Sequence, residues 1–309
     1  MSKILTITFS PSIDKSAKVN ALVPDKKMQC QQLNAEPGGG GINVSRVINR
    51  LGGNVTAVFP SGGYTGMYFN HLLEAENVPF VSIQTKNETR ENFVILDKST
   101  NLEYRFGMPS NEISAKELEI LISVIENQEN LEFIIASGSL PSGIPLDIYK
   151  KLSKIAQSKN AKFIVDTSGE ALKNALDEGV YLLKPNLEEL ATLLGITDLK
   201  IDNIEKAAKD LIDKNKIEIV VVSLGANGAM LATTNETYFI KPPKVKVKST
   251  VGAGDSMVAG IVFSLSKNLT LKECLEYGIA CGTATTMNLG SSLCEKKEVE
   301  KLLQIIKKQ

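Results

Sequence analysis

The sequence predicts an α/β protein built on a mostly parallel sheet that lies between two layers of helices. Short runs rich in β-branched residues alternate with amphipathic segments along most of the 309 residues. This alternation is typical of parallel strands joined by covering helices. Hydrophobic residues make up 43% of the chain, which is enough for one large domain or a domain with a small appendage. We therefore expect a single domain spanning residues 1–309.

The strands of the sheet are expected where short apolar runs are bounded by turn-forming residues. These runs are Ile4–Phe9, Thr56–Phe59, Phe133–Ser137, Lys162–Asp166, Tyr181–Lys184 and Ile217–Ser223. Amphipathic helices are expected at 42–51, 65–76, 115–127, 146–159, 170–178, 203–215, 254–266, 271–288 and 295–306. Ligands of such folds bind at the carboxyl ends of the strands. The functional residues are therefore expected in the segments that follow strands.

Two stretches, roughly 12–36 and 88–108, have the pattern of strands with no helix between them. The second contains ENFVILD and LEYRFG, in which apolar and polar side chains alternate. We expect these insertions to form a small antiparallel β-sheet lid that covers a site or pairs with another subunit. Exposed apolar faces on such a lid favour a homodimer. A further strand with one solvent-exposed face is expected at Pro242–Lys248, where valines alternate with lysines.

The charge balance argues against two classes of partner. Lys+Arg 35 and Asp+Glu 35 cancel, so we expect no nucleic acid and no membrane as a partner. The first apolar run stops at Ser10, too early for a signal peptide. No uncharged apolar stretch approaches the roughly 18 residues of a membrane span. The sequence therefore predicts a soluble, cytoplasmic protein.

The cysteines and the histidine give little sign of metal or triad chemistry. No C-x-x-C pair is present, which fits free thiols in a reducing compartment. We expect all four cysteines to be small buried hydrophobic residues: Cys30, Cys274, Cys281 and Cys294. The single histidine, His71, lies in a helical pattern without a nearby triad partner, which disfavours zinc and hydrolase functions. Chemistry by carboxylates, glycine backbone and a bound metal remains.

The most informative segment is STVGAGDS, at 249–256, which precedes an apolar helix. Small residues allow a tight turn, and the first N–H groups of the helix then face that turn. We expect the N–H groups of Gly252, Ala253, Gly254 and Asp255 to gather around a phosphoryl group, with help from the helix dipole. Asp255 also has an alternative role, as an N-cap or first-turn acid that needs no catalysis.

A second glycine turn, Gly38–Gly41, leads into a helix that begins near Asn43. Consecutive glycines let a ligand approach the backbone, and the Asn43 amide can point at a sugar hydroxyl. A plain loop or hinge is the alternative. The segment has neither the G-x-x-x-x-G-K-[ST] spacing of a Walker loop nor that of a dinucleotide fingerprint.

Three further strand ends carry candidate residues. In Lys184–Glu189 the side chain of Asn186 can cap a helix, or it can lie near phosphates while Glu189 orients water around Mg²⁺. The paired glycines of SLGANG, at 223–228, suit a nucleotide or a simple hairpin. The hydroxyls of Ser137 and Ser139 are expected at the same rim, or in ordinary turn chemistry.

Taken together, Asp14, Gly38–Arg46, Lys184–Glu189, Ser223–Gly228 and Thr250–Asp255 resemble, in this order, the ribokinase/PfkB family of carbohydrate kinases. The resemblance spans essentially the whole chain and implies a ribokinase-like three-layer α/β/α fold. The stretches EPGGGGINV, RFGMP, SGSLP, VDTSGEALKNAL and STVGAGDSM are most similar to the minor 6-phosphofructokinase type. Tagatose-6-phosphate kinases and 1-phosphofructokinases are also similar, but commonly carry Lys where this chain has Gly40. That difference favours fructose 6-phosphate.

The resemblance also implies roles for individual residues. Sugar-phosphate contacts are expected at Asp14, Lys27, Gly39, Gly40, Asn43, Arg90, Arg105 and Ser139, with Lys27 reaching the site of a neighbouring subunit. Nucleotide contacts are expected at Lys184, Asn186, Ser223, Gly225, Gly228 and Asn288. Glu189 is expected on the Mg²⁺ side, through water. Candidates for a monovalent cation such as K⁺ are Ser249, Val251, Asn288 and Gly290.

These expectations combine into an ATP-dependent sugar-phosphate kinase. Asp255 would accept the proton of the attacking hydroxyl while Gly252–Gly254 N–H groups and Mg²⁺ stabilise the transferred phosphoryl group. The rival from another class is a sugar-binding or nucleotide-binding regulator on the same fold, without turnover. ADP production that needs both Mg²⁺ and a sugar phosphate separates the two.

Overall fold

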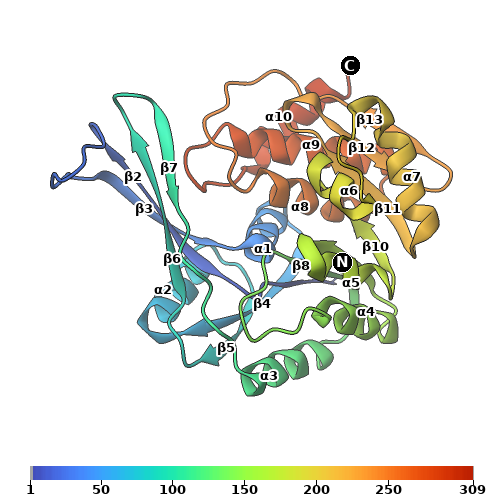
Figure 1. The fold of residues 1–309 in the computed structure, drawn as a ribbon, viewed down its shortest axis with the longest axis horizontal. Helices are drawn as coiled ribbons and strands as arrows, with labels where there is room; N and C mark the ends of the chain where they lie inside the picture. The colour runs from blue at the N-terminus through green and yellow to red at the C-terminus, as the bar shows by residue number, and fades with distance from the viewer. Residues whose placement is uncertain (1–2, 309) are drawn as a thin grey trace.

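The computed structural model describes residues 3–308 and contains one large sheet (Figure 1). Its strand order is β13 (Thr237–Ile240), β12 (Ala229–Ala232), β11 (Ile217–Ser223), β10 (Val180–Leu183), β9 (Lys162–Asp166), β8 (Leu131–Ser137), β1 (Lys3–Ile7), β4 (Asn54–Gly62) and β5 (Phe80–Thr85). The strands from β11 to β5 run parallel, and β12 and β13 are antiparallel additions at one edge. The predicted mostly parallel sheet is confirmed.

Helices cover both faces of this sheet because its strand residues alternate in direction. Leu5 and Ile7 of β1 pack in one cluster with helices α3 (Ala115–Glu126), α4 (Ile148–Ser158), α5 (Gly169–Leu176), α6 (Leu187–Leu194) and α7 (Ile204–Lys214). Ile4 packs on the other face with α1 (Gly40–Leu51), α8 (Ala253–Leu265), α9 (Leu271–Thr286) and α10 (Lys296–Ile306). Helix α2 (Gly63–Ala75) contributes Phe69 and Leu73 to a third cluster beside α1. The three-layer α/β/α prediction is confirmed.

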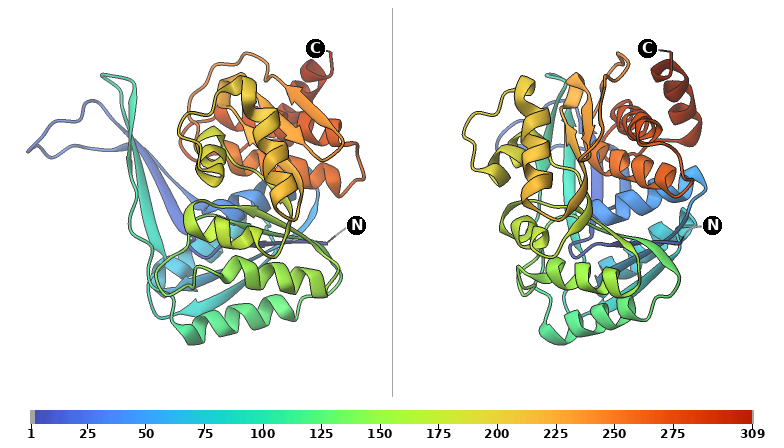
Figure 2. Two further views of the ribbon diagram at one scale, coloured as in Figure 1. Left: turned by 45° about the vertical axis from the view of Figure 1, so that its right-hand side comes forward. Right: turned by 90° about the vertical axis from the view of Figure 1, so that its right-hand side faces the viewer.

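A separate four-stranded sheet forms the lid, in the order β3 (Gln31–Gly38), β2 (Ser12–Val19), β6 (Arg90–Asp97) and β7 (Leu102–Phe106). It projects from one end of the body (Figures 1 and 2). The prediction of an antiparallel lid is wrong in one respect, because the central strands β2 and β6 pair in parallel. Both are the first strands of their insertions, so each leaves the body in the same direction.

Some strand predictions also fail. The expected strand at 242–248 is wrong, because these residues have no regular strand structure and Val247 is 57% exposed. Alternating Val and Lys alone do not make a strand, because a strand also needs a paired neighbour, and residues 242–248 do not join the edge strand β13. Strands β5, β12 and β13 were not expected. β12 and β13 have only four residues each, too few for a clear periodicity, and β5 mixes apolar with polar residues.

The helices and the cysteines bear on two expectations from composition. Among residues 3–308, no helix combines the length and apolar character that crossing a bilayer demands. Cys274, Cys281 and Cys294 are buried free thiols, as expected, but Cys30 is exposed and that part of the prediction is wrong. Cys30 lies in the connection between β2 and β3 of the lid, where no core is available.

Candidate active site

The two glycine turns meet at the carboxyl ends of the central strands. Asn43, in the first turn of α1, donates a hydrogen bond from Nδ2 to Asp255 Oδ2 at 2.9 Å. Ser137, at the end of β8, donates to Asp255 Oδ1 at 3.5 Å. A Cβ atom placed on Gly40 would meet the Ser137 side chain. The segments 38–43, 137–138 and 252–255 therefore share one site, although they lie far apart in the sequence.

The carboxyl group of Asp255 has a raised pKa. Burial raises its pKa to about 6, and the charge of Asp166 acts in the same direction, while Asn43, Lys184 and Ser137 oppose the shift. The residue remains partly exposed. A partly exposed carboxylate with an elevated pKa has the properties of a general base.

Lys184 supplies a buried positive charge beside this carboxylate. Its Nζ lies 3.2 Å from Asp166 Oδ1. Burial lowers the pKa of Lys184, but the Asp166 carboxylate outweighs burial and the net pKa is raised. A Cβ atom on Gly254 would lie 3.5 Å from Lys184 Nζ, so the ammonium reaches the start of α8. An anion bound at that helix end would meet a permanent cation.

The turn before α8 requires glycine at its centre. Gly252 has φ 72°, in the left-handed region, and a Cβ atom there would lie 2.6 Å from Leu293 Cδ2. The first regular helical bond runs from Ser256 N to Gly252 O at 2.9 Å, and Ala253 N is turned to Thr250 O at 3.4 Å. The N–H groups of Gly254 and Asp255 thus stand at the positive end of the helix, the position that binds phosphoryl oxygens in many proteins.

Asp14, predicted to contact the sugar, is held at the base of the lid. Its Oδ1 accepts hydrogen bonds from Ser12 Oγ at 2.8 Å and from Asn92 Nδ2 at 2.9 Å. Burial raises the pKa of Asp14 despite these bonds and the nearby Arg90. The carboxyl group also lies directly against Gly38, where any side chain would displace it. Asp14 can therefore accept hydrogen bonds from ligand hydroxyls next to the first glycine turn.

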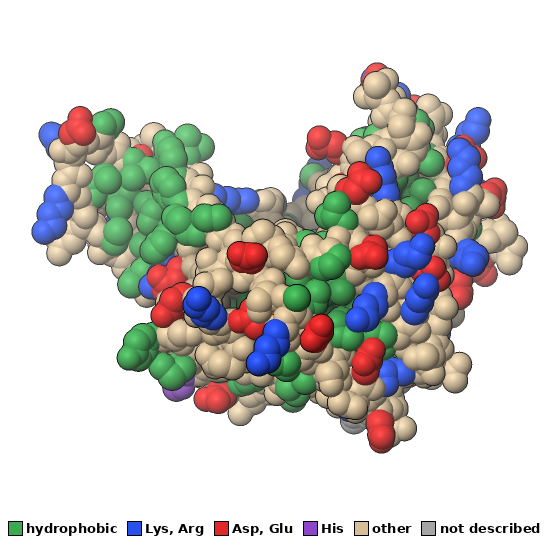
Figure 3. All heavy atoms as spheres, turned by 60° about the horizontal axis from the view of Figure 1, so that its bottom comes forward, with side chains coloured by type: hydrophobic (Ala, Val, Ile, Leu, Met, Phe, Trp, Pro, Cys, Tyr) green, Lys and Arg blue, Asp and Glu red, His purple; other side chains and the backbone are tan. Residues whose placement is uncertain are grey.

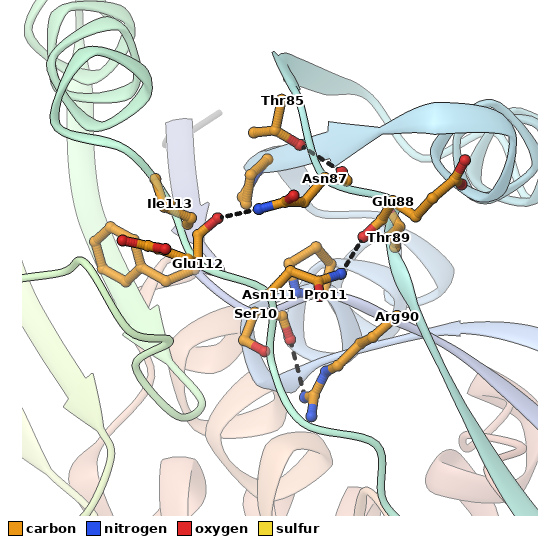
Figure 4. Close-up of a pocket in the computed structure, with 12 residues that line it drawn as sticks. Ser10, Pro11, Thr85, Asn87, Glu88, Thr89, Arg90, Asn111, Glu112 and Ile113 are labelled. Atoms are coloured by element: carbon orange, nitrogen blue, oxygen red, sulfur yellow. Dashed lines mark hydrogen bonds between the residues drawn. The ribbon is translucent and has the colours of Figure 1, made fainter.

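Arg90 lies next to this carboxyl group, at one end of a polar pocket between lid and body (Figure 4). Its guanidinium donates to Met108 O at 3.0 Å and to Ser10 O at 3.2 Å. Its Nε is buried and has no hydrogen-bond partner among residues 3–308. A phosphate would provide the acceptor that Nε lacks.

Two other predicted phosphate contacts lie further out on the lid. Arg105, on β7, is 50% exposed and pairs with Glu103 at 3.2 Å. Glu103 in turn faces Ser249 of the body, with 3.5 Å between Ser249 Oγ and Glu103 Oε2. Lys27 is exposed in the connection between β2 and β3. Gly39 (φ 109°) lies in the first glycine turn, and Ser139 is exposed just after β8.

Most of the residues predicted to contact the nucleotide serve as helix-cap or hairpin residues. Asn186 and Glu189 form a reciprocal cap at the start of α6, with 2.8 Å for both hydrogen bonds. Ser223 bridges to Asn186, and Gly225 and Gly228 form the hairpin between β11 and β12. The capping and hairpin alternatives are thus confirmed. The nucleotide contacts stay predictions.

The loop after α9 carries two of the candidates for a monovalent cation. Asn288 Nδ2 donates to Leu293 O at 3.2 Å, and Gly290 (φ 59°) lies against Ser16 of the lid. Ser249 N lies 3.3 Å from Thr286 O at the end of α9, so the two candidate loops approach each other there. The backbone N–H of Val251 donates a hydrogen bond to Ser249 Oγ at 3.4 Å.

Comparison with known proteins gives the family. Residues 7–298 match the pfkB family of carbohydrate kinases. The chain belongs to this family. It is 39% identical to the ATP-dependent 6-phosphofructokinase isozyme 2 of Escherichia coli strain K12, across 98% of both chains. It is also 32% identical to the 1-phosphofructokinase of Bacillus subtilis strain 168, again over 98% of both chains, and 32% identical to a tagatose-6-phosphate kinase of Staphylococcus epidermidis over 92% of both.

Solved structures of pfkB-type proteins agree with the fold described above. The phosphofructokinase-2 of Escherichia coli, in complex with potassium, matches with a TM-score of 0.95, 39% identity and coverage of 99% of this chain and 100% of that one. A ribokinase from Thermotoga maritima matches with a TM-score of 0.77 and 23% identity, covering 98% of this chain and all of the other, which supports the fold alone. The ribokinase-like fold is confirmed.

Sequence reasoning missed one residue of this candidate site that the structure makes prominent. Asp166 raises the pKa of Asp255 and pairs with Lys184. The sequence could have predicted this role, because Asp166 is an acidic residue at the carboxyl end of the apolar strand Lys162–Asp166, where ligands of such folds bind. VDTSG was interpreted only as part of a family motif, without a role for its aspartate.

Proposed function

We propose that this chain is an ATP-dependent sugar-phosphate kinase whose acceptor is fructose 6-phosphate and whose product is fructose 1,6-bisphosphate. The observation that carries this proposal is a hydrogen bond between the two glycine turns. Asn43, in the first turn of α1, donates to Asp255, which lies in the first turn of α8 and has a raised pKa. One carboxylate thus faces both the acceptor side and the helix end suited to phosphate. The names of the relatives, all sugar-phosphate kinases, support the reaction class.

In the proposed mechanism the acceptor sugar lies between Asp14 and Asn43. Asp14 binds ring hydroxyls, and Arg90 holds the phosphate group with its free Nε. The buried Asn43 Oδ1, which has no partner within residues 3–308, provides a further acceptor for a hydroxyl. This arrangement directs the free primary hydroxyl toward Asp255, which accepts its proton as the hydroxyl attacks the γ-phosphorus.

The ATP phosphates would lie against the start of α8. The N–H groups of Gly254 and Asp255 and the Lys184 ammonium stabilise charge on the transferred group. The residues fit Mg²⁺ held mainly by phosphates and water, because the Glu189 carboxylate, at the start of α6, is of the type that orients water around this ion. Glu189 would orient such water with Oε1, since its Oε2 is used in the cap. Bound Mg²⁺ would neutralise charge on the phosphates.

A monovalent cation is proposed beside this helix end, held by the loop Ser249–Val251 and by Asn288 and Gly290. The approach of Ser249 to the end of α9 supports this proposal. The Escherichia coli phosphofructokinase-2 has been solved in complex with potassium. The measurement is turnover in KCl compared with an equal concentration of a tetraalkylammonium chloride, and equal rates would contradict a K⁺ site.

The choice of acceptor is tested by kcat/KM for fructose 6-phosphate, tagatose 6-phosphate and fructose 1-phosphate at fixed Mg²⁺ and ATP. We expect the highest value for fructose 6-phosphate. A Cβ atom on Gly40 would lie only 2.8 Å from Gly138 N. The structure therefore disfavours any side chain at position 40, where tagatose-6-phosphate kinases commonly have Lys. A higher value for either other sugar would correct the acceptor. No ADP with any sugar would favour a non-catalytic regulator.

We also propose that the protein forms a homodimer through the outer face of the lid. Cross-strand pairs Phe93–Phe106 and Ile95–Tyr104 place apolar side chains on one face of this sheet. The large exposed members are Leu33 (67%), Leu102 (58%), Tyr104 (40%) and Phe106 (47%), and Figure 3 shows a hydrophobic patch on the lid. Apolar patches of this kind usually mark interfaces. The Escherichia coli enzyme has been solved as a tetrameric inhibited form. Pairing of two lids would carry Lys27 toward the partner's site.

A further inference from the structure

Glu36 is a lid residue to which neither the family resemblance nor the proposed mechanism gives a role. Glu36 lies on β3, directly opposite Asp14 of β2 in the strand register. Its two carboxylate oxygens bind two different parts of the body. Oε1 accepts a hydrogen bond from Ser292 Oγ at 2.5 Å, and Oε2 accepts one from Arg46 Nη2 at 3.1 Å. One side chain therefore connects the strand beside Asp14 to α1 and to the loop after α9.

The α1 partner of Glu36 is rigidly held. The side chain of Arg46 is 1% exposed and pairs with Glu76 as well as Glu36. Its Nη1 also donates to Pro37 O at 2.8 Å, so it grips the residue that follows Glu36. Burial lowers the pKa of Arg46, but Glu76 and Glu36 outweigh burial and raise it, which keeps the guanidinium charged. Arg46 lies one helical turn beyond Asn43, so it fixes β3 relative to the residue that contacts Asp255.

The second partner, Ser292, belongs to a loop that packs on the phosphate end of the site. Its neighbour Leu293 lies so close to Gly252 that a Cβ atom there would be 2.6 Å from Leu293 Cδ2. Leu293 O accepts hydrogen bonds from Arg50 Nη1 at 3.1 Å and from Asn288 Nδ2 at 3.2 Å. The loop is thus fixed to α1 and touches the turn that opens α8.

We propose that Glu36 is a positioning residue that sets the separation between the acceptor carboxylate Asp14 and the phosphate turn at Gly252. The chain of contacts runs from Asp14 through Glu36 and Ser292 to Leu293 and Gly252. Direct phosphoryl transfer requires reacting atoms roughly 3–3.5 Å apart, and a misplacement of about 1 Å can cost ~100-fold in rate. This inference rests on the proposed function, because it specifies how the sugar is held relative to ATP.

The test compares Glu36→Gln and Ser292→Ala with a control, Glu295→Gln. Glu295 is a 63% exposed partner of Arg50 in the same ion-pair network, at 3.1 Å, and lies at its solvent edge. A hydrogen bond to a charged group is worth about 1.5–3 kcal/mol, or ~10-fold to 100-fold. We expect kcat/KM for fructose 6-phosphate to fall about 10-fold in Glu36→Gln and ~5-fold in Ser292→Ala, because Ser292→Ala leaves the Arg46 contact in place. The KM for ATP and the control variant should stay within about 2-fold of the wild type.

The double variant tests whether Glu36 and Ser292 act through one hydrogen bond. If they do, Glu36→Gln with Ser292→Ala should lower kcat/KM for fructose 6-phosphate little beyond Glu36→Gln alone. A purely structural role would also lower the Tm and raise the KM for ATP. The inference is overturned if kcat/KM for fructose 6-phosphate is unchanged, or if its fall comes with a higher KM for ATP and a lower Tm. Should Glu36→Gln fail to fold, Ser292→Ala alone decides. A wild type without sugar-dependent ADP formation would refute the proposed function, whereas unchanged variants of an active enzyme would refute only the role of Glu36.

Discussion

Replacing Asp255 by Asn should stabilise the protein at neutral pH while it removes activity. Burial raises the pKa of Asp255 from 3.8 to about 6. Each pKa unit corresponds to ~1.36 kcal/mol, so keeping this group ionised at pH 7 costs the folded state roughly 3 kcal/mol at most. Because the residue is partly exposed to solvent, a value of about 1–3 kcal/mol is expected.

The sign follows from proton binding. Between pH 4 and 6, roughly, the folded protein holds a proton on Asp255 that the unfolded chain has released. The stability due to this group is therefore complete at low pH and is lost as the pH rises through about 6. Asn at this position has no such dependence. The stability gain of Asp255→Asn should appear at pH 7.5 and disappear near pH 4.

The assay is thermal unfolding at both pH values, together with steady-state kinetics. A gain of ~1–3 kcal/mol corresponds to several degrees, at roughly 2–4 °C per kcal/mol for domains somewhat smaller than this one. The kcat should fall at least about 100-fold, the usual loss for a general base. The control is Asp198→Asn, since Asp198 is 70% exposed and should change neither quantity. A variant that is no more stable than the wild type at pH 7.5, or that keeps near-native turnover, would refute the reasoning.

Further predictions concern the surrounding residues. The wild-type rate should fall about tenfold per pH unit below pH 6, where Asp255 is protonated, as a pH profile of kcat would show. Lys184→Met should move this fall to higher pH, since Lys184 lowers the pKa of Asp255, and an unmoved profile would contradict the assigned charge effect. Gly252→Ala should destabilise the fold by at least ~1–2 kcal/mol in denaturant unfolding, because the left-handed backbone disfavours a Cβ atom; unchanged unfolding would argue against that backbone. Arg90→Ala should raise the KM for fructose 6-phosphate at least ~10-fold with little change for ATP, since a charge-assisted hydrogen bond is lost. Tyr104→Asp should yield monomers in sedimentation experiments if the lid face pairs, and a persistent dimer would place the interface elsewhere.

The sequence was sufficient for the body of the fold because its periodicity is strong. The helix ending at Leu51 and the strand Lys162–Asp166 both have the expected bounds at these points, since local apolar patterns determine them. The parallel pairing of β2 with β6 was not predictable in this way. It depends on how two distant insertions leave the body, and no local pattern encodes that direction.

The candidate site was predictable at the level of motifs but not of contacts. The glycine turns at 38–41 and 252–254 gave the location, because positive φ and close approach demand glycine. The side-chain partners of Asp255 were beyond local reasoning, since Asn43 is 212 residues away in the sequence. Likewise, Glu36 carries no local signal for its bond to Ser292, which joins residues separated by 256 positions.

The most direct test of the central claim follows the γ-phosphoryl group itself. Wild-type protein, ATP labelled at the γ-phosphate, Mg²⁺ and fructose 6-phosphate should yield labelled fructose 1,6-bisphosphate and ADP in equal amounts. Asp255→Asn should bind both substrates and form neither product at a comparable rate. Label found only in inorganic phosphate, or equal labelling of the sugar by the Asn variant, would contradict a phosphoryl transfer in which Asp255 accepts the proton.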